Sequence, residues 1–473
     1  MSKTFFFYDL ETSGLSARDD RIMQFAGRRT DEDFKPIGDP YNILVKLNDD
    51  TLPSPDALMV TGITPQSTVQ DGITEAEFAA LFCGEIATPD TTILGFNNIR
   101  FDDEFIRHLL WRNFYDPYEW AWSEGRSRWD MLDVVRMTRA LRPDGIQWPV
   151  DKEGKATNRL ELLTRENGIA HENAHDALSD VDALIAITKL IKEKQPQLFT
   201  YLLEMRSKKK VQELINLDNK KPFVYTSGRY DSTYEKTTVA FPLTTAPNSN
   251  VLVYDLRHDP TQFVGLDKKA LEKKIYASYE ERQMEGFVKL PIKVLQYNRC
   301  PAVAPLGVLS QGDSWQKIGL TSSVLEQHIK ILTEAPGFAE NLREIYETRP
   351  EYKKSSDPEA QLYDGFVDNR DKVRIEAVRN ASEDALIDFL PSFQDERLGE
   401  LLLHYKARSF PKTLSKDEQD AWEVWRADHL KKQLPSFMKS LQRIATTNND
   451  ERTQFILQEL QLWAENVLPE ADY

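Results

Sequence analysis

The spacing of apolar and polar positions in the first hundred or so residues predicts a sheet with helices on either side of its last strand. Four consecutive aromatics at residues 5–8 predict a strand that is buried on both faces. Apolar residues at helical spacing predict one helix over residues 74–83 and another that begins at residue 102. Further apolar runs between turn residues predict strands at 21–31, 41–47 and 91–97. The predicted order β-β-β-α-β-α indicates an α/β domain.

The first strand ends in two acidic residues, Asp9 and Glu11, followed by the turn Thr12-Ser13-Gly14. Side chains alternate along a strand, so both carboxylates point to the same side. Two negative charges about 4 Å apart repel by roughly 4 kcal/mol at an effective dielectric near 20, and either a cation or a shared proton would offset this repulsion. Solvated surface is the alternative for such a tripeptide, but a strand end before a turn favours a site for Mg²⁺ or Mn²⁺.

A second acidic pair, Asp102 and Asp103, begins the helix after the fourth strand. Helical spacing with Phe105, Ile106 and Leu109 predicts that Asp102 lies on the side facing the sheet and that Asp103 lies toward solvent. The alternative is that both acids only stabilise the helix N-terminus through its dipole.

A third acid, Asp180, borders the apolar stripe of a helix predicted from residue 176 to about 193. His175 precedes Asp180 by five residues, which on a helix would turn it about 140° off the same face. We therefore expect His175 to project from the entry loop, where it could reach a bound substrate; a structural role is the alternative.

Residues 107–142 are rich in aromatic rings and arginines. Stacked rings and guanidinium groups are what a channel for a single-stranded nucleic acid requires. The alternative is a packed core with a solvated rim.

Composition narrows the classes of protein. A chain of 473 residues with 40% hydrophobic and 29% charged content is expected to form two to four globular domains. It has no apolar run of membrane-spanning length and no signal-peptide pattern, so a cytoplasmic protein without a membrane segment is expected. Two cysteines, Cys83 and Cys300, argue against a disulfide framework and a cysteine zinc site. The net charge of −16 points away from nucleic acid, although basic clusters such as Lys208–Lys210 can form a local positive channel.

The second half of the chain divides at a polar stretch, residues 349–358, which predicts a linker. Before it, short apolar runs predict strands at residues 222–227, 237–243, 251–256 and 290–297. After it, the sequence is strongly helical. The expected domains are residues 1–195, 196–350 and 355–473.

Three motifs together resemble those of the DEDD superfamily of 3′-to-5′ exonucleases, in its histidine-bearing DEDDh branch: Asp9-x-Glu11, Asp102 after Asn97-x-x-x-Phe101, and His175-x-x-x-x-Asp180. Within it, the whole chain resembles the bacterial exonuclease I family, on the stretches 95–104, 112–118, 127–130, 140–146 and 360–366. The resemblance implies a ribonuclease H-like exonuclease domain with a mixed sheet and flanking helices, a small SH3-like β-rich domain and a C-terminal α-helical domain.

The resemblance also implies an activity: processive 3′-to-5′ hydrolysis of single-stranded DNA, with release of nucleoside 5′-monophosphates, in mismatch repair and recombination. Two Mg²⁺ ions, for which Mn²⁺ can substitute, would bind Asp9, Glu11, Asp102 and Asp180. His175 would act as general base, Glu11 would also receive the terminal 3′ hydroxyl, and Arg159 would clamp a phosphate; a surface ion pair is the alternative for Arg159.

Further contacts follow from the same resemblance. The expected partner is the single-stranded DNA-binding protein, through its acidic C-terminal tail, and a monomer is expected. The candidate contacts to DNA are Arg107, Tyr118, Trp122, Arg136, Asn173, Lys208, Gln361 and Tyr363. The candidate contacts to the partner's tail are Arg142, Tyr201 and Lys221.

Two other functions remain open. Oligoribonuclease and RNase T share these motifs and process RNA, but their chains are much shorter and lack the C-terminal domains. A non-catalytic DNA-binding scaffold is the second alternative; the presence of all four acids and the histidine argues against it.

Overall fold

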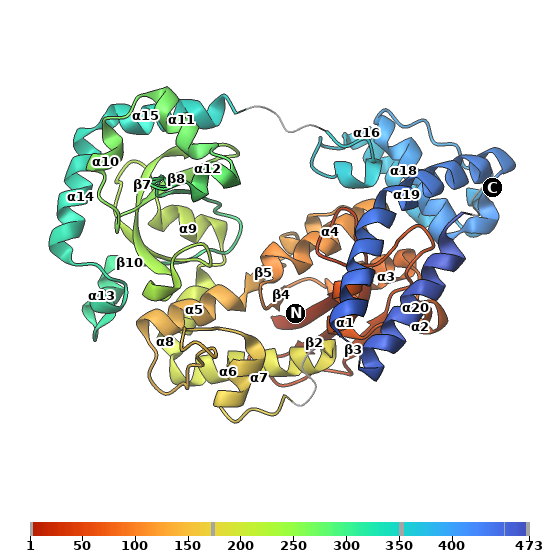
Figure 1. Cartoon of the computed structure of the whole chain (residues 1–473), viewed down its shortest axis with the longest axis horizontal. Helices are drawn as coiled ribbons and strands as arrows, with labels where there is room; N and C mark the ends of the chain where they lie inside the picture. Colours follow the sequence, from red (N-terminus) through yellow and green to blue (C-terminus); the bar gives the residue numbers. More distant parts are fainter. Residues whose placement is uncertain (1–2, 172–175, 350–353, 449, 470–473) are drawn as a thin grey trace. The chain divides into compact units, whose positions relative to one another are not determined.

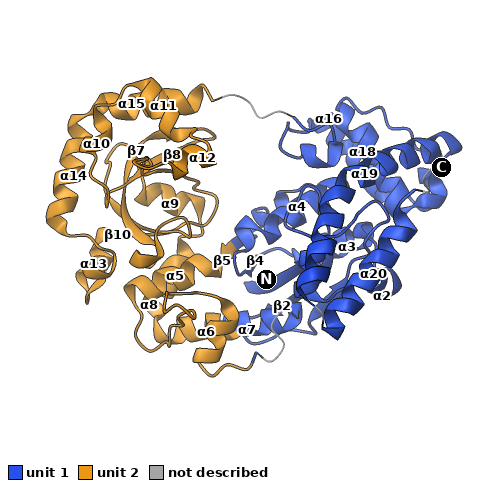
Figure 2. Cartoon of the chain, viewed as in Figure 1, with its two compact units in different colours: residues 1–128, 171–185, 353–473 blue, residues 129–170, 186–352 orange. Residues whose placement is uncertain are grey.

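The computed structural model describes residues 3–171, 176–349, 354–448 and 450–469. The chain forms two compact units, which Figure 2 colours separately. Unit 1 comprises residues 1–128, 171–185 and 353–473, and unit 2 comprises residues 129–170 and 186–352.

A five-stranded mixed sheet of order β3-β2-β1-β4-β5 organises the N-terminal part of the chain (Figure 1). Its central strand β1 runs antiparallel to β2 and parallel to β4, while β3 pairs antiparallel with β2. The four strands expected here are confirmed, and β1 contains both acids, as expected. The strands are β1 (Thr4–Thr12), β2 (Ile22–Thr30), β3 (Tyr41–Leu44), β4 (Thr91–Gly95) and β5 (Ser127–Asp130).

Alternation along β1 separates its core face from its polar face. Phe6, Tyr8 and Leu10 belong to one buried apolar cluster, which also contains Phe25 and Phe78. Burying these large apolar side chains contributes roughly 1.5–3 kcal/mol each. Asp9 and Glu11, at the intervening positions, are only half-buried and therefore occupy the other face of the strand.

Three helices, rather than the single one expected, lie between β3 and β4. The expected helix at residues 74–83 is present as α3 and continues as a π-turn, η1 (Phe82–Ile86). The two additional helices each begin with a proline in the first turn, after Ser54 and Thr64, which is a signal of a helix start. The helices are α1 (Pro55–Thr61), α2 (Pro65–Asp71) and α3 (Glu75–Leu81).

The helical segment after the linker packs within unit 1. Leu430, Phe437 and Leu441 share an apolar cluster with Leu47 and Leu58 of the N-terminal part. The prediction of a helical C-terminal region is confirmed. Its elements are η6 (Pro358–Gln361), α16 (Asn369–Asn380), α17 (Glu383–Leu386), α18 (Glu396–Ser409), η7 (Pro411–Thr413), α19 (Lys416–Thr447) and α20 (Glu451–Val467). Besides α1, α2, α3 and η1, the helices of this unit are η2 (Asn98–Arg100), α4 (Asp102–Arg112), η3 (Glu119–Ala121) and the start of α7 (Ala177–Lys194).

Unit 2 contains a second five-stranded sheet, antiparallel throughout, of order β10-β6-β7-β8-β9. Its strands are β6 (Phe223–Thr226), β7 (Thr237–Ala246), β8 (Asn250–Asp255), β9 (Ile292–Leu295) and β10 (Ala302–Pro305). The four strands expected in this region are confirmed. The short β10, which follows Pro301 and ends at Pro305, was not anticipated, because proline is usually absent from strand interiors.

Unit 2 contains more helices than its β-rich sequence suggested. They are α5 (Met131–Leu141), α6 (Leu160–Glu166), the end of α7, α8 (Pro196–Glu204), α9 (Lys208–Leu214), α10 (Thr261–Val264), α11 (Lys268–Ile275), α12 (Tyr279–Gln283), α13 (Ser314–Lys317), α14 (Ser322–Glu334) and α15 (Pro336–Glu347), with the short η4 (Ser232–Tyr234) and η5 (Leu306–Ser310). Among the residues that the structure describes, no helix is long and apolar enough to cross a membrane.

Candidate active site

Three of the expected acids meet in unit 1. Asp9 and Glu11 of β1 and Asp180, in the first turn of α7, each place one carboxylate oxygen so that all three oxygens lie within 4.8 Å of one another. We call Asp9, Glu11 and Asp180 the acidic group. Closely spaced carboxylate oxygens on a half-buried surface are the ligand set that hard divalent cations prefer, so these residues fit a divalent metal.

The electrostatics of the acidic group also call for a cation. Burial, together with repulsion from Asp180, raises the pKa of Asp9 from 3.8 to about 8. Burial, with repulsion from Asp9 and Asp180, raises the pKa of Glu11 from 4.5 to about 9. Without a metal, these two carboxyls therefore hold protons at neutral pH.

The fourth expected acid lies on a neighbouring element. Asp102 is the first residue of α4 and is buried, but it is not among the three side chains whose oxygens satisfy the 4.8 Å limit. We expected the next residue, Asp103, to face solvent, but its side chain is fully buried. The hydroxyl of Tyr8 and the amide of Asn98 donate to it, and Arg128 forms an ion pair with it. These partners offset the cost of burying its charge.

The expected general base, His175, and the expected DNA contact Asn173 lie outside the described residues. A different histidine contacts the acidic group: Nε2 of His171 lies 2.5 Å from Oδ1 of Asp180. Sequence reasoning missed this contact. His171 precedes Asp180 by nine residues in a segment without strand or helix periodicity, so no spacing signal could have indicated it.

Three of the expected DNA contacts form one cluster in unit 1. The guanidinium of Arg107 lies 5.5 Å from the ring centroid of Tyr118, and the rings of Tyr118 and Tyr363 are 6.4 Å apart. Tyr363, whose side chain is 45% exposed, donates to Glu104 at 2.5 Å, and Glu104 pairs with Arg107. Residues more than 240 positions apart therefore place an exposed ring, Tyr363, beside a buried arginine that is paired with Glu104.

The remaining expected DNA contacts differ in setting. Trp122 is 66% exposed, whereas Trp111, Phe114, Trp120 and Trp129 are buried, so the core interpretation holds for those four rings. Gln361 donates to the Ser355 carbonyl at 2.5 Å. In unit 2, Arg136 pairs with Asp133, and Lys208 is exposed in the first turn of α9.

The expected substrate clamp and partner contacts all belong to unit 2. Arg159 is exposed and pairs with Glu161 at 2.6 Å, which is the surface ion pair we named as its alternative. Arg142 donates to the Val308 carbonyl at 3.0 Å. Burial raises the pKa of Tyr201 to about 12, and Lys221 is exposed.

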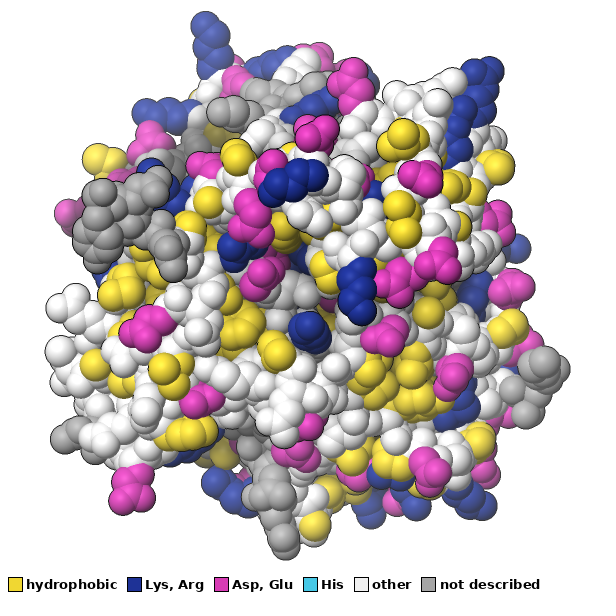
Figure 3. All heavy atoms as spheres, turned by 90° about the vertical axis from the view of Figure 1, so that its right-hand side faces the viewer, with side chains coloured by type: hydrophobic (Ala, Val, Ile, Leu, Met, Phe, Trp, Pro, Cys, Tyr) yellow, Lys and Arg dark blue, Asp and Glu magenta, His cyan; other side chains and the backbone are white. Residues whose placement is uncertain are grey.

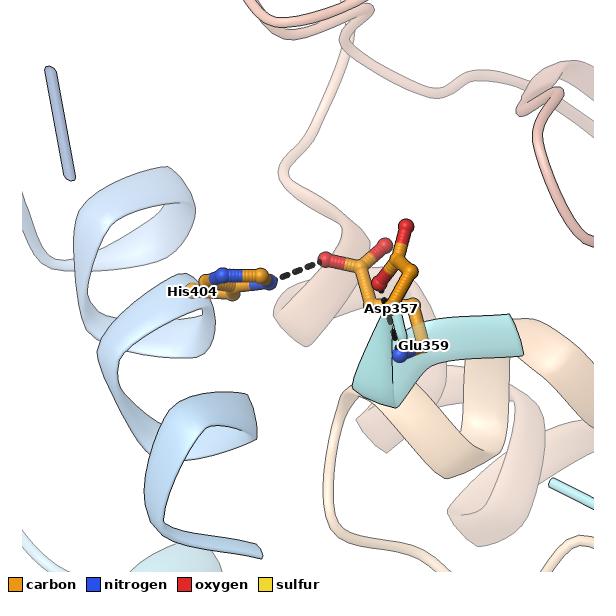
Figure 4. A group of neighbouring side chains, drawn as sticks. All are labelled: Asp357, Glu359 and His404. Atoms are coloured by element: carbon orange, nitrogen blue, oxygen red, sulfur yellow. Dashed lines mark hydrogen bonds and ion pairs between the residues drawn. The ribbon is translucent and has the colours of Figure 1, made fainter. Parts of the chain in front are cut away.

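A second cluster of candidate metal ligands, Asp357, Glu359 and His404, is a buried ion network instead (Figure 4). His404 Nδ1 lies 2.7 Å from one oxygen of Glu359, and Arg408 lies 2.5 Å from the same oxygen. Arg21 donates to the other oxygen at 2.9 Å. Cationic side chains thus occupy both oxygens of Glu359, and a further cation would be repelled by them.

The fold and the acidic group define a nuclease of the exonuclease class: the family profile described as "Exonuclease" matches residues 6–188. The profiles of the exonuclease I SH3-like domain and the exonuclease I C-terminal domain match residues 206–348 and 356–467. The chain is 39% identical to exodeoxyribonuclease I of Haemophilus influenzae, over 96% of both chains, and 38% identical to that of Escherichia coli, over 98% of both. It belongs to the exonuclease I family.

Solved structures agree with this assignment. E. coli exonuclease I in complex with a dA16 oligonucleotide superposes with a TM-score of 0.95 at 37% identity, over 99% of this chain and 100% of that one. A zinc-bound form of the E. coli exonuclease I complex with single-stranded DNA gives a TM-score of 0.94 at 37% identity, with the same coverage. A structure of SSB and exonuclease I with the inhibitor CFAM gives 0.91 at 36% identity, again with that coverage.

Proposed function

We propose that this chain is a metal-dependent exonuclease that degrades single-stranded DNA processively from its 3′ end and releases nucleoside 5′-monophosphates. The observation that carries the proposal is the acidic group, in which three carboxylate oxygens from β1 and α7 lie within 4.8 Å of one another. Family membership over nearly the whole chain supports the substrate, since the relatives are exodeoxyribonucleases.

The proposed cofactor is Mg²⁺, two ions per site, with Mn²⁺ as a substitute. Asp9, Glu11 and Asp180 would hold them together with Asp102. When bound, the metal would activate the attacking water and stabilise the charge on the leaving 3′ oxygen. A zinc-bound form of a relative supports the binding of a divalent ion by this chain.

The chain's own residues have distinct tasks in this proposal. The acidic group would hold the cations that bind the scissile phosphate, and Glu11 would also receive the terminal 3′ hydroxyl. His175 takes the proton of the attacking water, since an imidazole that titrates near neutral pH suits a general base. His171 holds Asp180 through its 2.5 Å contact, and Arg159 pairs with a phosphate when DNA displaces Glu161.

Metal binding should release protons and depend on pH. Because the pKa of Asp9 is about 8 and that of Glu11 about 9 without metal, Mg²⁺ must displace one to two protons at pH 7, and its affinity should rise steadily from pH 6 to 9. Calorimetry in two buffers of different ionisation enthalpy measures the number released. A proton release of zero at pH 7 would contradict the assignment.

The same pKa values predict how the stability of the metal-free protein changes with pH. A carboxyl whose pKa is higher in the folded state binds its proton more tightly there than in the unfolded state. This contribution to stability is complete below the unfolded values of 3.8 and 4.5 and is lost as the pH rises through 8 to 9. Mg²⁺ should restore the lost stability at high pH.

The cluster of Arg107, Tyr118 and Tyr363 should bind DNA by stacking and charge. We expect Tyr363→Ala to weaken binding of single-stranded DNA by about 1–3 kcal/mol, which is typical of one base stacked on a ring, as measured by fluorescence anisotropy in chelator. Tyr363→Phe keeps the ring and should bind within about twofold of the parent chain. Equal affinities of the Ala and Phe variants for DNA would show that the ring of Tyr363 does not contact the DNA.

Because the chain is acidic overall, binding the phosphates of DNA requires basic side chains at the contact surface. On the face in Figure 3, the described acidic and basic side chains are interspersed with apolar ones, without an extended basic patch. We propose that Arg107, Tyr118, Trp122, Gln361 and Tyr363 of unit 1, Arg136 and Lys208 of unit 2, and Asn173 contact the strand, and that enclosing the strand slows its dissociation between cuts.

We also propose that the chain binds the acidic C-terminal tail of a single-stranded DNA-binding protein through Arg142, Tyr201 and Lys221. Tyr201 lines a shallow pocket with Pro196, Gln197, Thr200 and Glu204, and the solved complex of SSB with a relative supports such a partner. The domain bounds 1–195, 196–350 and 355–473, a monomeric state, a cytoplasmic location and a role in mismatch repair and recombination stay predictions of the sequence.

The experiment that tests the proposed function uses 5′-labelled single-stranded DNA and a matched RNA, each with Mg²⁺ or with chelator. A ladder that shortens from the 3′ end of DNA only in Mg²⁺ is the expected result. DNA that is bound but intact would favour the scaffold, and faster shortening of RNA would favour RNA turnover.

A further inference from the structure

One buried hydrogen bond joins the two elements that carry Asp9 and Asp102. Tyr8, beside Asp9 on β1, donates its hydroxyl to Oδ1 of Asp103, beside Asp102 on α4, at 2.6 Å. The two residues are 95 positions apart, and both side chains are essentially inaccessible to solvent. The bond therefore joins the residue before Asp9 to the residue after Asp102.

The Asp103 carboxylate is fixed from further directions as well. Asn98, in η2, donates to the same Oδ1 at 3.0 Å, and Arg128 of β5 pairs with Oδ2. A carboxylate held by partners from β1, η2 and β5 is confined to one rotamer, because any other would leave buried polar groups without partners. The carboxylate is thus a rigid link between α4 and the sheet.

The backbone around this link is also closely packed. A Cβ atom on Gly95, the last residue of β4, would lie 3.0 Å from the Tyr8 carbonyl oxygen and 2.8 Å from Cβ of Asn98. Only glycine permits this approach without a shift of the chain. The strand that carries Asp9 and the segment that leads into Asp102 are therefore held at short range by both backbone and side chains.

The positions of Tyr8 and Asp103 next to the two acids relate their hydrogen bond to the distance between the acids. Side chains alternate along β1, so Tyr8 packs in the core against Phe25, while Asp9 points to the other face, where Glu11 and Asp180 lie. Consecutive residues of a helix point about 100° apart, so Asp102 and Asp103 project in different directions from the same first turn of α4. A rigid Tyr8–Asp103 contact on one side fixes the separation of Asp9 and Asp102 on the other.

We propose that Tyr8 and Asp103 are positioning residues whose hydrogen bond sets the spacing of Asp9 and Asp102 and thereby the affinity of the site for its divalent metal. The inference rests on the proposed function in that Asp102 shares the metal with the acidic group. Partners of metal ligands commonly act in this way, and their loss typically costs about 10- to 100-fold in metal affinity or activity.

The test compares Tyr8→Phe with the parent chain and with Tyr254→Phe. Phenylalanine keeps the packed ring and removes only the hydroxyl. The Tyr254 hydroxyl is also buried and has no hydrogen-bond partner among the described residues, so its removal is a matched control. Calorimetric titration of the metal-free full chain with Mg²⁺, without DNA, reads metal affinity independently of activity.

We expect Tyr8→Phe to bind Mg²⁺ about 10- to 100-fold more weakly, and Tyr254→Phe to bind it as the parent does. Cleavage by Tyr8→Phe should need correspondingly more Mg²⁺, but kcat at saturating Mg²⁺ and DNA affinity in chelator should approach parent values. The far-UV circular dichroism of metal-free Tyr8→Phe should match that of the parent, which separates this effect from a general loss of structure.

Two results would overturn the proposal: parent-like Mg²⁺ affinity in Tyr8→Phe, or a loss of kcat that saturating Mg²⁺ does not restore. Failure of the proposed function is a separate outcome. If the parent chain binds Mg²⁺ but does not shorten DNA, the proposed exonuclease activity is wrong. Weaker Mg²⁺ binding by Tyr8→Phe would still support the positioning role in that case.

Discussion

Asp180→Asn should abolish cleavage of single-stranded DNA while leaving DNA binding intact. Asparagine keeps the shape of the side chain but removes one of the three carboxyl groups that would hold the metal. Loss of a residue that merely orients a metal ligand typically costs about 10- to 100-fold, so loss of a proposed ligand should lower kcat by more than about 1,000-fold. Steady-state cleavage of labelled DNA in Mg²⁺ measures it.

The matched control is Asp182→Asn, two residues further along α7. Asp182 is 52% exposed and pairs with Arg28 at 2.8 Å, so its loss should change kcat by less than about threefold and stability by at most about 1 kcal/mol. In chelator, Asp180→Asn should bind DNA at least as tightly as the parent, because it removes a negative charge near the phosphates. Retained turnover in Asp180→Asn would disprove the metal assignment.

Glu359→Gln should cause the largest loss of stability among single charge removals in unit 1. Glu359 is fully buried, with Arg21, Arg408 and His404 on its two oxygens. Breaking a buried ion pair by removing one partner costs about 3–5 kcal/mol, since the other charge stays buried. Urea unfolding followed by tryptophan fluorescence measures the change in the free energy of unfolding.

Its control is Glu423→Gln in α19, because Glu423 pairs with Arg426 at 2.7 Å but is 57% exposed. An exposed pair contributes at most about 1 kcal/mol. Similar losses of unfolding free energy for both variants would show that the buried network contributes no more stability than an exposed ion pair.

The stability that Glu359 contributes should also depend on pH. Burial alone would raise the pKa of Glu359, but Arg408, Arg21 and His404 hold it well below its usual 4.5. A carboxyl with a lowered folded pKa contributes stability that is complete above the unfolded value and is lost as the pH falls through the folded value. The difference between parent and Glu359→Gln should therefore shrink only below about pH 4.5.

Local periodicity explains what the sequence could predict. Alternation along β1 placed Asp9 and Glu11 on one face, and the helical stripe of α7 placed Asp180 at its border. Both features depend on a few neighbouring residues, so one sequence suffices to indicate them. Family motifs then supplied the order and spacing that joined the separate acids into one site.

The features that the sequence could not predict depend on contacts between residues far apart in the chain. Asp103 was expected toward solvent because its partners, Tyr8 and Arg128, lie 95 and 25 positions away. Arg21 and Glu359 are 338 positions apart, so no local pattern indicates that they pair or that residues 353–473 pack with residues 1–128. His171 approaches Asp180 from a segment without periodicity, where only the folded chain shows the contact.

The central claim is that metal held by the acidic group contacts the scissile phosphate. The most direct measurement replaces a non-bridging oxygen of the last linkage with sulfur, in each configuration, and compares cleavage in Mg²⁺ and Mn²⁺. Because Mn²⁺ accepts sulfur more readily than Mg²⁺, the predicted result is slow cleavage of one isomer in Mg²⁺ that Mn²⁺ restores. Equal slowing of that isomer by sulfur in both metals would contradict direct contact between metal and phosphate.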